Sequence, residues 1–227
     1  MRKYLFLFLA ILSMATVFTS CSSDDDDNDN GFSISLSEAT IKGVDNFVQI
    51  TSSSPNVKWS SENPYVATIS EGGKIKSAHI GETYIVAQND GKTKKCKVIV
   101  TPQYSIYTEP ITDFGKSKEE IIKTLGTPFL DKGDILSYVN DNQDIIVNYI
   151  FKDGKLDNCV VLLKVTLNII NLVDFLKERY ELVPRDFNGN YAFINALTTK
   201  EASMIVTLRS RPINGVLVVQ YNKYNKQ

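Results

Sequence analysis

Residues 117–128 read SKEEIIKTLGTP, and this stretch decides how the C-terminal half of the chain is interpreted. Ser117 followed three residues later by Glu120 is a capping-box pattern, typical of the first turn of a helix. Gly126 is typical of the residue that ends a helix, and Pro128 prevents the helix from resuming. The stretch therefore predicts a short helix whose apolar stripe consists of Ile121, Ile122 and Leu125.

Three strand-like runs follow this helix, at residues 135–139, 145–151 and 157–165. Asp153-Gly154 separates the second run from the third, and this dipeptide is a strong signal for a tight hairpin turn. We therefore expect the second and third runs to pair as antiparallel strands.

The same order of elements then repeats. Asn168 is predicted to open a second helix, and its apolar face repeats the offsets of the first with Leu172, Val173 and Leu176. Three more strand-like runs follow, at residues 191–196, 203–209 and 215–221. We expect an α+β domain over residues 103–227 built from two αβββ repeats, about 103–165 and 166–227. They would share one antiparallel sheet with both helices on one face. A chance likeness between two ordinary helix–strand segments is the alternative explanation.

The pattern S-x-E-E-[IV]-x-x-x-[LF]-G-x-P at residues 117–128, with the strands after it, resembles small envelope lipoprotein domains of the SmpA/OmlA type. Relatives of those domains with a duplicated unit resemble secreted β-lactamase-inhibitor proteins. The resemblance covers part of the C-terminal domain. It implies a domain that binds a partner rather than an enzyme.

Residues 32–102 have the spacing of short strands separated by turns, which favours an all-β sandwich. The expected strands lie at 32–36, 47–50, 57–59, 66–69, around 75, 84–86 and 96–100. The run VKWSSENPYVATI at residues 57–69 resembles the core of group 2 bacterial immunoglobulin-like domains. Gly73-Lys74-Ile75, Gly81–Ile85 and Cys96–Val100 resemble its continuation. The resemblance implies an Ig-like spacer or adhesive module of a surface protein.

Single residues of these two domains are expected to be structural. Trp59 is interpreted as the core tryptophan of the sandwich, with a ligand platform as the alternative. His79 is expected at the surface. Cys96 and Cys159 share the parity of apolar strand residues, so buried free thiols are expected rather than a disulfide between them.

Residues 1–20 have the character of a secretory signal peptide. Arg2 and Lys3 precede a fourteen-residue apolar run that is too short to span a membrane, which takes about 20 residues. The sequence F-T-S-C ending at Cys21 resembles a bacterial lipobox, which implies that the thiol of Cys21 carries the lipid anchor and that the protein is an outer membrane lipoprotein. An ordinary cleaved signal with a chance cysteine is the alternative.

Residues 21–31 are predicted to be an extended acidic linker. Five aspartates follow Cys21 within nine residues, and like charges keep a chain extended. Serine and an acidic run after a lipidated cysteine resemble the surface-export signal of some gut-dwelling Gram-negative bacteria. The segment also matches half of a calcium-loop pattern, but Ser37 stands where the bidentate acid belongs, so no calcium site is predicted.

The composition excludes several classes of function. The chain has 227 residues, is 43% apolar and carries a formal net charge of −1. That charge gives no support for a nucleic-acid partner. One histidine leaves little room for a His-based triad or a His-rich metal site. We therefore predict no catalytic residue, no cofactor and no metal.

Two groups in the C-terminal domain remain as candidates. Asp174 and Glu178 lie four residues apart beside Arg179, and we expect all three on a solvated helix face. The tyrosines are either ordinary sheet residues or exposed rings that stack on glycan or protein. They are Tyr104, Tyr107, Tyr138, Tyr149, Tyr180, Tyr191, Tyr221 and Tyr224.

The sequence thus favours a non-enzymatic, surface-exposed lipoprotein in which a sandwich stalk presents a C-terminal domain that binds protein or glycan. A periplasm-facing envelope assembly factor or inhibitor is the first alternative. An enzyme that uses carboxylates alone is the second, because glycosidases need only two acids.

Overall fold

A computed structural model of the chain describes residues 31–164, 169–183 and 190–224. Residues 32–227 form one compact unit. The predicted signal peptide, Cys21 and the aspartate run of the predicted linker lie outside the described residues, as does Asn168. Within the described ranges, no helix has the length and apolar character needed to cross a membrane.

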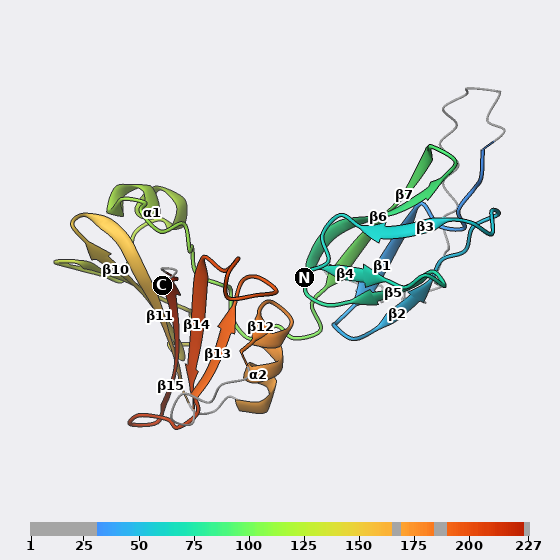
Figure 1. Cartoon of the computed structure of the whole chain (residues 1–227). Helices are drawn as coiled ribbons and strands as arrows, with labels where there is room; N and C mark the ends of the chain where they lie inside the picture. Colours follow the sequence, from blue (N-terminus) through green and yellow to red (C-terminus); the bar gives the residue numbers. More distant parts are fainter. Residues whose placement is uncertain (1–30, 165–168, 184–189, 225–227) are drawn as a thin grey trace, which may run out of the picture. The chain divides into compact units, whose positions relative to one another are not determined.

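Seven strands make up the N-terminal part of the compact unit (Figure 1). Their bounds are β1 Glu38–Lys42, β2 Phe47–Gln49, β3 Lys58–Ser61, β4 Ala67–Ile69, β5 Lys74–Ser77, β6 Gly81–Asn89 and β7 Lys92–Thr101. They form a sheet of order β1-β7-β6-β3 and a sheet of order β2-β5-β4. The β1–β7 pair is parallel, and the other described pairs are antiparallel.

The core of this part contains the apolar residues that alternate along the strands, including Ile75, Ile85, Cys96 and Val98. Trp59 is half-buried and packs against this core, as predicted. The prediction of a strand over 32–36 was wrong: Ile34 makes one isolated bridge to Ser52. The first strand is instead β1, where only Ala39 and Ile41 turn inward. Two inward apolar residues are too few for the sequence pattern to predict this strand.

In the C-terminal part, the described residues form two helices and eight strands. The helices are α1 Lys118–Leu125 and α2 Ile169–Lys177. The strands are β8 Leu130–Lys132, β9 Ile135–Val139, β10 Ile145–Lys152, β11 Lys155–Lys164, β12 Glu181–Leu182, β13 Asn190–Ile194, β14 Met204–Arg209 and β15 Val216–Lys223. All eight lie in one antiparallel sheet of order β12-β13-β14-β15-β11-β10-β9-β8.

Helix α1 begins and ends where the sequence predicts. The Ser117 side chain accepts a hydrogen bond from the Glu120 backbone N–H, and the Glu120 carboxylate accepts one from the Ser117 N–H. Gly126 follows the helix at a φ of 81°, a left-handed value that glycine adopts without strain. Ile121 is fully buried, whereas Leu125 is exposed.

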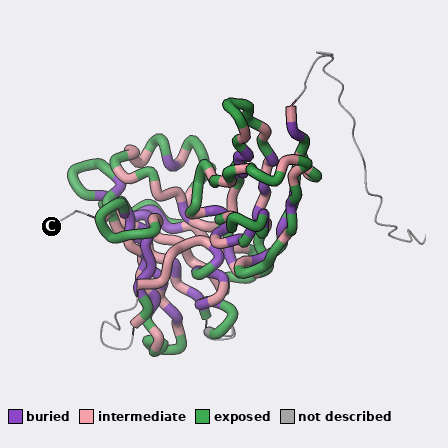
Figure 2. Tube along the Cα trace, turned by 45° about the vertical axis from the view of Figure 1, so that its right-hand side comes forward, coloured by how far each residue is buried: buried purple, intermediate pink, exposed green. Residues whose placement is uncertain are grey.

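Both helices cover the same face of the sheet. Ile121 of α1 and Leu172, Phe175 and Leu176 of α2 belong to one buried cluster with inward side chains of β9, β10, β11, β13, β14 and β15. Along β11, β14 and β15 the buried residues are separated by exposed or partly exposed ones. Figure 2 shows buried and exposed positions following one another along the chain. This arrangement gives the sheet one covered face and one face that no described helix covers.

The expectation of six strands in this sheet was too low. β8 and β12 add one short strand at each edge, and with three and two residues they are too short to show an alternating pattern. The strand order runs outward from the central β11–β15 pair in matching sequence, β10-β9-β8 on one side and β14-β13-β12 on the other. The predicted hairpin is present, with Asp153 and Gly154 both at positive φ, 52° and 72°.

Candidate functional site

The uncovered face of the eight-stranded sheet presents a regular set of nine side chains from its three central strands. Directly opposite residues on paired strands point to the same side of a sheet, as do alternate residues on one strand. The pairing therefore gives three rows across β10, β11 and β15: Ile146–Leu162–Val218, Asn148–Val160–Gln220 and Ile150–Asn158–Asn222. We call these nine residues the open face.

The open face combines aliphatic and amide groups and carries no charge. All nine residues are partly exposed. Neither of the two apolar cores of the described chain includes its five aliphatic members. The nine include no aromatic residue either. The face is therefore apolar surface that the described part of the chain leaves without a packing partner.

The four amide side chains of the open face lie in two of its three rows, next to the aliphatic row. Gln220 Nε2 donates to Asn222 Oδ1 at 3.0 Å. Asn158 Nδ2 donates to Asp157 Oδ2 at 3.1 Å, while the buried Oδ1 of Asn158 has no hydrogen-bond partner in the described chain. An unpaired buried acceptor costs free energy unless a donor reaches it. Because this oxygen is shielded from solvent, it is a cost to the folded domain and not a contact that a ligand can reach.

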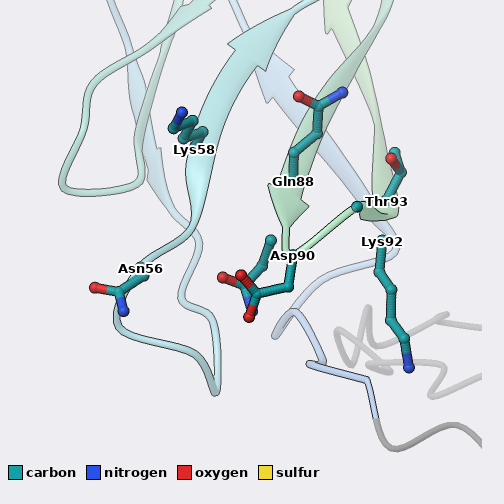
Figure 3. Close-up of a pocket in the computed structure, with 8 residues that line it drawn as sticks. Asn56, Lys58, Gln88, Asp90, Lys92 and Thr93 are labelled. Carbon is teal, nitrogen blue, oxygen red and sulfur yellow. The ribbon is translucent and has the colours of Figure 1, made fainter.

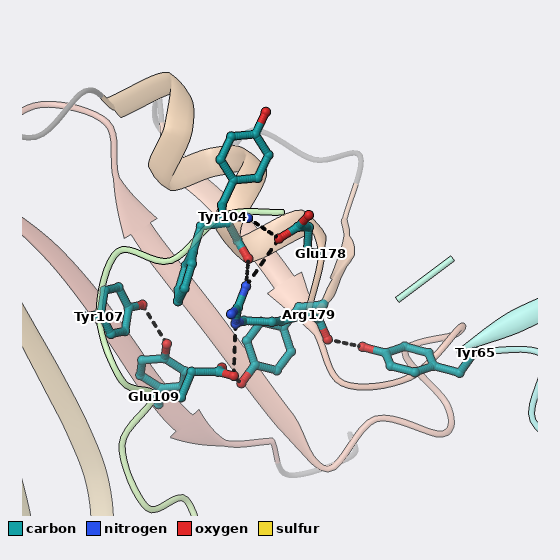
Figure 4. A network of polar contacts seen from close by, with 9 residues as sticks. Tyr65, Tyr104, Tyr107, Glu109, Glu178 and Arg179 are labelled. Atoms are coloured by element: carbon teal, nitrogen blue, oxygen red, sulfur yellow. Dashed lines mark hydrogen bonds and ion pairs between the residues drawn. The ribbon is translucent and has the colours of Figure 1, made fainter. Parts of the chain in front are cut away.

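Glu178 does not lie on a solvated face, so that prediction was wrong. Its side chain is 1% exposed because α2 ends against the segment that enters the domain from β7. Its two carboxylate oxygens accept the backbone N–H groups of Gln103 and Tyr104, at 2.9 and 3.0 Å (Figure 4). Asp174 lies farther out, 36% exposed, with its carboxylate 3.9 Å from Lys177 Nζ.

Arg179 is also held inside this network. Its Nε donates to Glu109 Oε2 at 3.1 Å, and its guanidinium lies 3.6 Å from the ring centroid of Phe175 (Figure 4). The Tyr180 hydroxyl donates to the other oxygen of Glu109. Burial, reinforced by the Glu109 carboxylate, raises the pKa of Tyr180 well above its usual value. These charged groups already bond one another, so the network joins the entering segment to α2 rather than offering free acid–base groups.

His79 is buried, not at the surface as predicted. It is 4% exposed and stacks on the Tyr65 ring at 4.0 Å with an interplanar angle of 11°. Its Nδ1 lies 2.7 Å from the Tyr65 carbonyl oxygen, which can only accept, so Nδ1 carries the proton. The Tyr65 hydroxyl in turn donates to the Arg179 carbonyl oxygen at 2.7 Å (Figure 4). One histidine in a polar sequence gave no sign of this packing.

The remaining single-residue predictions divide in the same way. Cys96 and Cys159 are buried free thiols, as expected. Tyr107, Tyr149 and Tyr221 are buried on the covered side of the sheet. Tyr191 is the large exposed tyrosine of this domain, at 38%, and it pairs with Leu208 at a covered-side position. Tyr104, Tyr138 and Tyr180 pack against the core from the covered side, and Tyr224, just beyond the end of β15, is partly exposed. None of the nine open-face residues is a tyrosine.

One hollow of about 470 Å³ lies beside the β6–β7 turn of the sandwich (Figure 3). Its lining is polar and none of it is buried. The residues are Asn56, Lys58, Gln88, Asn89, Asp90, Gly91, Lys92 and Thr93. No group of three or more His, Cys, Asp or Glu side chains in the described residues is placed to hold a metal ion.

Sequence reasoning did not single out the open-face amides. The signal was available: amides alternate with aliphatic residues in Ile146-x-Asn148-x-Ile150 and in Val218-x-Gln220-x-Asn222. Strand alternation shows that two faces differ. It does not show which strands become neighbours, and only the pairing brings the amides together.

Comparison with known proteins identifies no family. No family model matches the chain, and no curated protein matches it. Among solved structures, domains 5–6 of the S-layer protein SbsC align over 87% of this chain and 85% of their own length, with 13% identity and a TM-score of 0.26. The Bacteroides ovatus mixed-linkage glucan utilization locus protein SGBP-B, in complex with a mixed-linkage heptasaccharide, aligns over 91% of this chain. The alignment covers 61% of its own length, at 10% identity and a TM-score of 0.23. At TM-scores this low, neither likeness carries the fold or the ligand over to this chain.

Proposed function

We propose that the protein is a non-enzymatic lipoprotein of the cell surface whose C-terminal sheet binds a protein ligand through the open face. The observation that carries the proposal is the aliphatic row Ile146–Leu162–Val218, which is partly exposed and belongs to no core. Uncovered apolar surface rimmed by polar groups is typical of an interaction site. The next row on the same side pairs Lys164 with Val216, so the aliphatic row lies between amide groups and one positive charge.

A protein ligand fits the open face better than a glycan does. The open face places an aliphatic row directly beside a row with two amides, and such a mixture of apolar and hydrogen-bonding groups is usual in protein–protein interfaces. The face offers no aromatic ring on which a sugar could stack.

The rest of the chain would deliver this face to its ligand. We propose that Cys21 carries the lipid, that residues 22–31 form the tether, and that the sandwich of residues 32–102 is an Ig-like stalk. The matching strand order on the two sides of the β11–β15 pair supports an origin of the C-terminal domain by duplication of one αβ unit.

Site-specific photo-crosslinking tests the binding face. A photoreactive phenylalanine analogue in place of Leu162 is expected to give a discrete protein adduct on intact cells, and Val218→Glu should abolish that adduct. The same analogue in place of Lys123, exposed on α1, is the matched control on the covered side. Failure of Leu162 to crosslink, or an equal adduct from Lys123, would refute the proposal.

Protease treatment of intact cells tests the location. Loss of the protein supports surface display, whereas full protection supports the alternative of a periplasm-facing assembly factor or inhibitor. Replacing Cys21 with alanine is expected to release the protein from the membrane fraction in either case, because the anchor is lost.

Assays on a broad panel of glycans and peptides test the absence of catalysis. We expect no turnover above that of the buffer. Robust hydrolysis that a single carboxylate substitution abolishes would overturn the non-enzymatic assignment and favour a carboxylate-only enzyme.

A further inference from the structure

A separate pocket lies on the helix-covered side of the sheet, away from the open face. Its volume of about 420 Å³ is within the range of small-ligand sites. The strand floor comes from β9 and β10, and the rim comes from the segment that precedes α1. The lining residues are Ser105, Ile106, Tyr107, Thr108, Tyr138, Val139, Asn140, Ile145 and Val147.

The wall of this pocket is apolar and uncharged. Ile106, Tyr138, Ile145 and Val147 are partly buried and pack on the domain core, so the wall continues the core outward. The hydroxyl of Tyr138 donates to the Gly126 carbonyl at 3.0 Å. Because this hydroxyl is already bonded, the wall offers a ligand the ring carbons of Tyr138 and aliphatic groups, and no charge.

The rim supplies the polar groups. No hydrogen bond in the described chain engages the backbone N–H groups of residues 105–108. The segment is nevertheless fixed on both sides. Glu178 holds the N–H of Tyr104, and the Tyr149 hydroxyl accepts the N–H of Ile111 at 3.2 Å. The stretch lies outside the strands and bends at Ile106 and Tyr107, so its unused donors and acceptors can bond single amide groups of a ligand rather than extend a sheet.

We propose that this pocket binds an uncharged peptide segment, which inserts one apolar side chain against Val147 and hydrogen-bonds its backbone amides to the unused groups of residues 105–108. The lining carries no charge to recognise a charged ligand, and the carboxylate of nearby Glu109 is already bonded to Arg179 and Tyr180. Both parts of a peptide, side chain and amides, find complementary groups here. The site is distinct from the open face, so it would be a second contact point of the same domain.

NMR titration of the ¹⁵N-labelled full-length protein tests the site, with N-acetyl-leucine N-methylamide as the probe. This probe carries one apolar side chain and two amides. The backbone signals of residues 105–108 are expected to shift on titration. The substitution Val147→Phe fills the pocket and should weaken binding by about tenfold or more, because the apolar side chain loses its place.

Val160→Phe is the matched control, since it makes the same change on the opposite face of the neighbouring strand. It should leave probe binding unchanged, while it is expected to impair crosslinking from the open face, so the two proposals fail separately. If Val147→Phe does not fold, Ile106→Ala replaces it, with weaker binding expected. Unmoved signals at residues 105–108 up to the solubility limit of the probe would overturn the inference. Equal binding of methyl α-glucopyranoside would also overturn it.

Discussion

Replacing Glu178 with alanine is expected to destabilise the C-terminal domain strongly. The side chain is 1% exposed and accepts two backbone N–H groups, from Gln103 and Tyr104. A hydrogen bond to a charged group contributes about 1.5–3 kcal/mol, and the substitution removes two of them. Water can reach Gln103, which is exposed, so part of the loss is recovered. We expect the free energy of unfolding to fall by about 3 kcal/mol.

Urea unfolding followed by far-ultraviolet circular dichroism measures this change. A loss of 3 kcal/mol corresponds to a fall in Tm of about 6–12 °C for a protein of this size. Glu178→Gln keeps an acceptor oxygen without the charge, and we expect about half the effect. The fluorescence of Trp59, the one tryptophan of the chain, reports on the sandwich and shows whether the loss is confined to the C-terminal domain.

Asp174→Ala is the control, because it removes a carboxylate from the same helix that is 36% exposed and weakly paired with Lys177. Its effect should be within about 0.5 kcal/mol of zero. The reasoning is refuted if Glu178→Ala unfolds at the same urea concentration as Asp174→Ala. That result would mean that water satisfies the two backbone N–H groups as favourably as the carboxylate does.

Three further outcomes are expected. In the sandwich, Gly73→Ala places a Cβ 2.2 Å from the Ile50 carbonyl oxygen at a φ of +78°, and it should lower the free energy of unfolding by more than about 1 kcal/mol, measured by Trp59 fluorescence. Gly91→Ala, at a φ of +77° in open space, should lower it clearly less, and equal losses of stability would contradict the steric argument. Burial raises the pKa of Cys96 to about 11 and of Cys159 to about 12, so a thiol reagent at pH 8 should modify neither until urea unfolds the protein, and rapid labelling of the native protein would contradict their burial. Burial also raises the pKa of Tyr149 to about 12, so the folded state holds a proton that the unfolded state loses above pH 10. The free energy of unfolding, measured by urea titration at each pH, should therefore stay level up to about pH 9 and fall as the pH rises from 10 towards 12.

The sequence predicted best where a local rule acts within a few residues. The capping box at Ser117 and Glu120, the end of α1 at Gly126 and the Asp153-Gly154 hairpin all depend on neighbours along the chain. The buried thiols followed from strand parity alone. The structure has each of these features where the pattern placed it.

The errors concern residues whose surroundings come from distant parts of the chain. Glu178 directly follows α2, at a spacing from Asp174 typical of a solvated helix face, yet a segment some 75 residues earlier in sequence buries it. His79 follows a polar stretch, and its burial depends on stacking with Tyr65. The open face was missed for the same reason. Alternation predicted its strands, but the sequence does not predict the register that aligns Leu162 with Ile146 and Val218.

The central β11–β15 pair also sets the order in which this domain can form. Asn158 pairs with Asn222 and Lys164 with Val216, so the middle of the sheet closes only after β15 is available (Figure 1). Until then β11, ten residues long, presents an open hydrogen-bonding edge beside apolar side chains. Pairings between residues so far apart in sequence form slowly, and exposed edges of this kind recruit other chains. A chain that stops after Lys164 is therefore expected to aggregate rather than to fold as half a domain, even though its own helix and strands are complete.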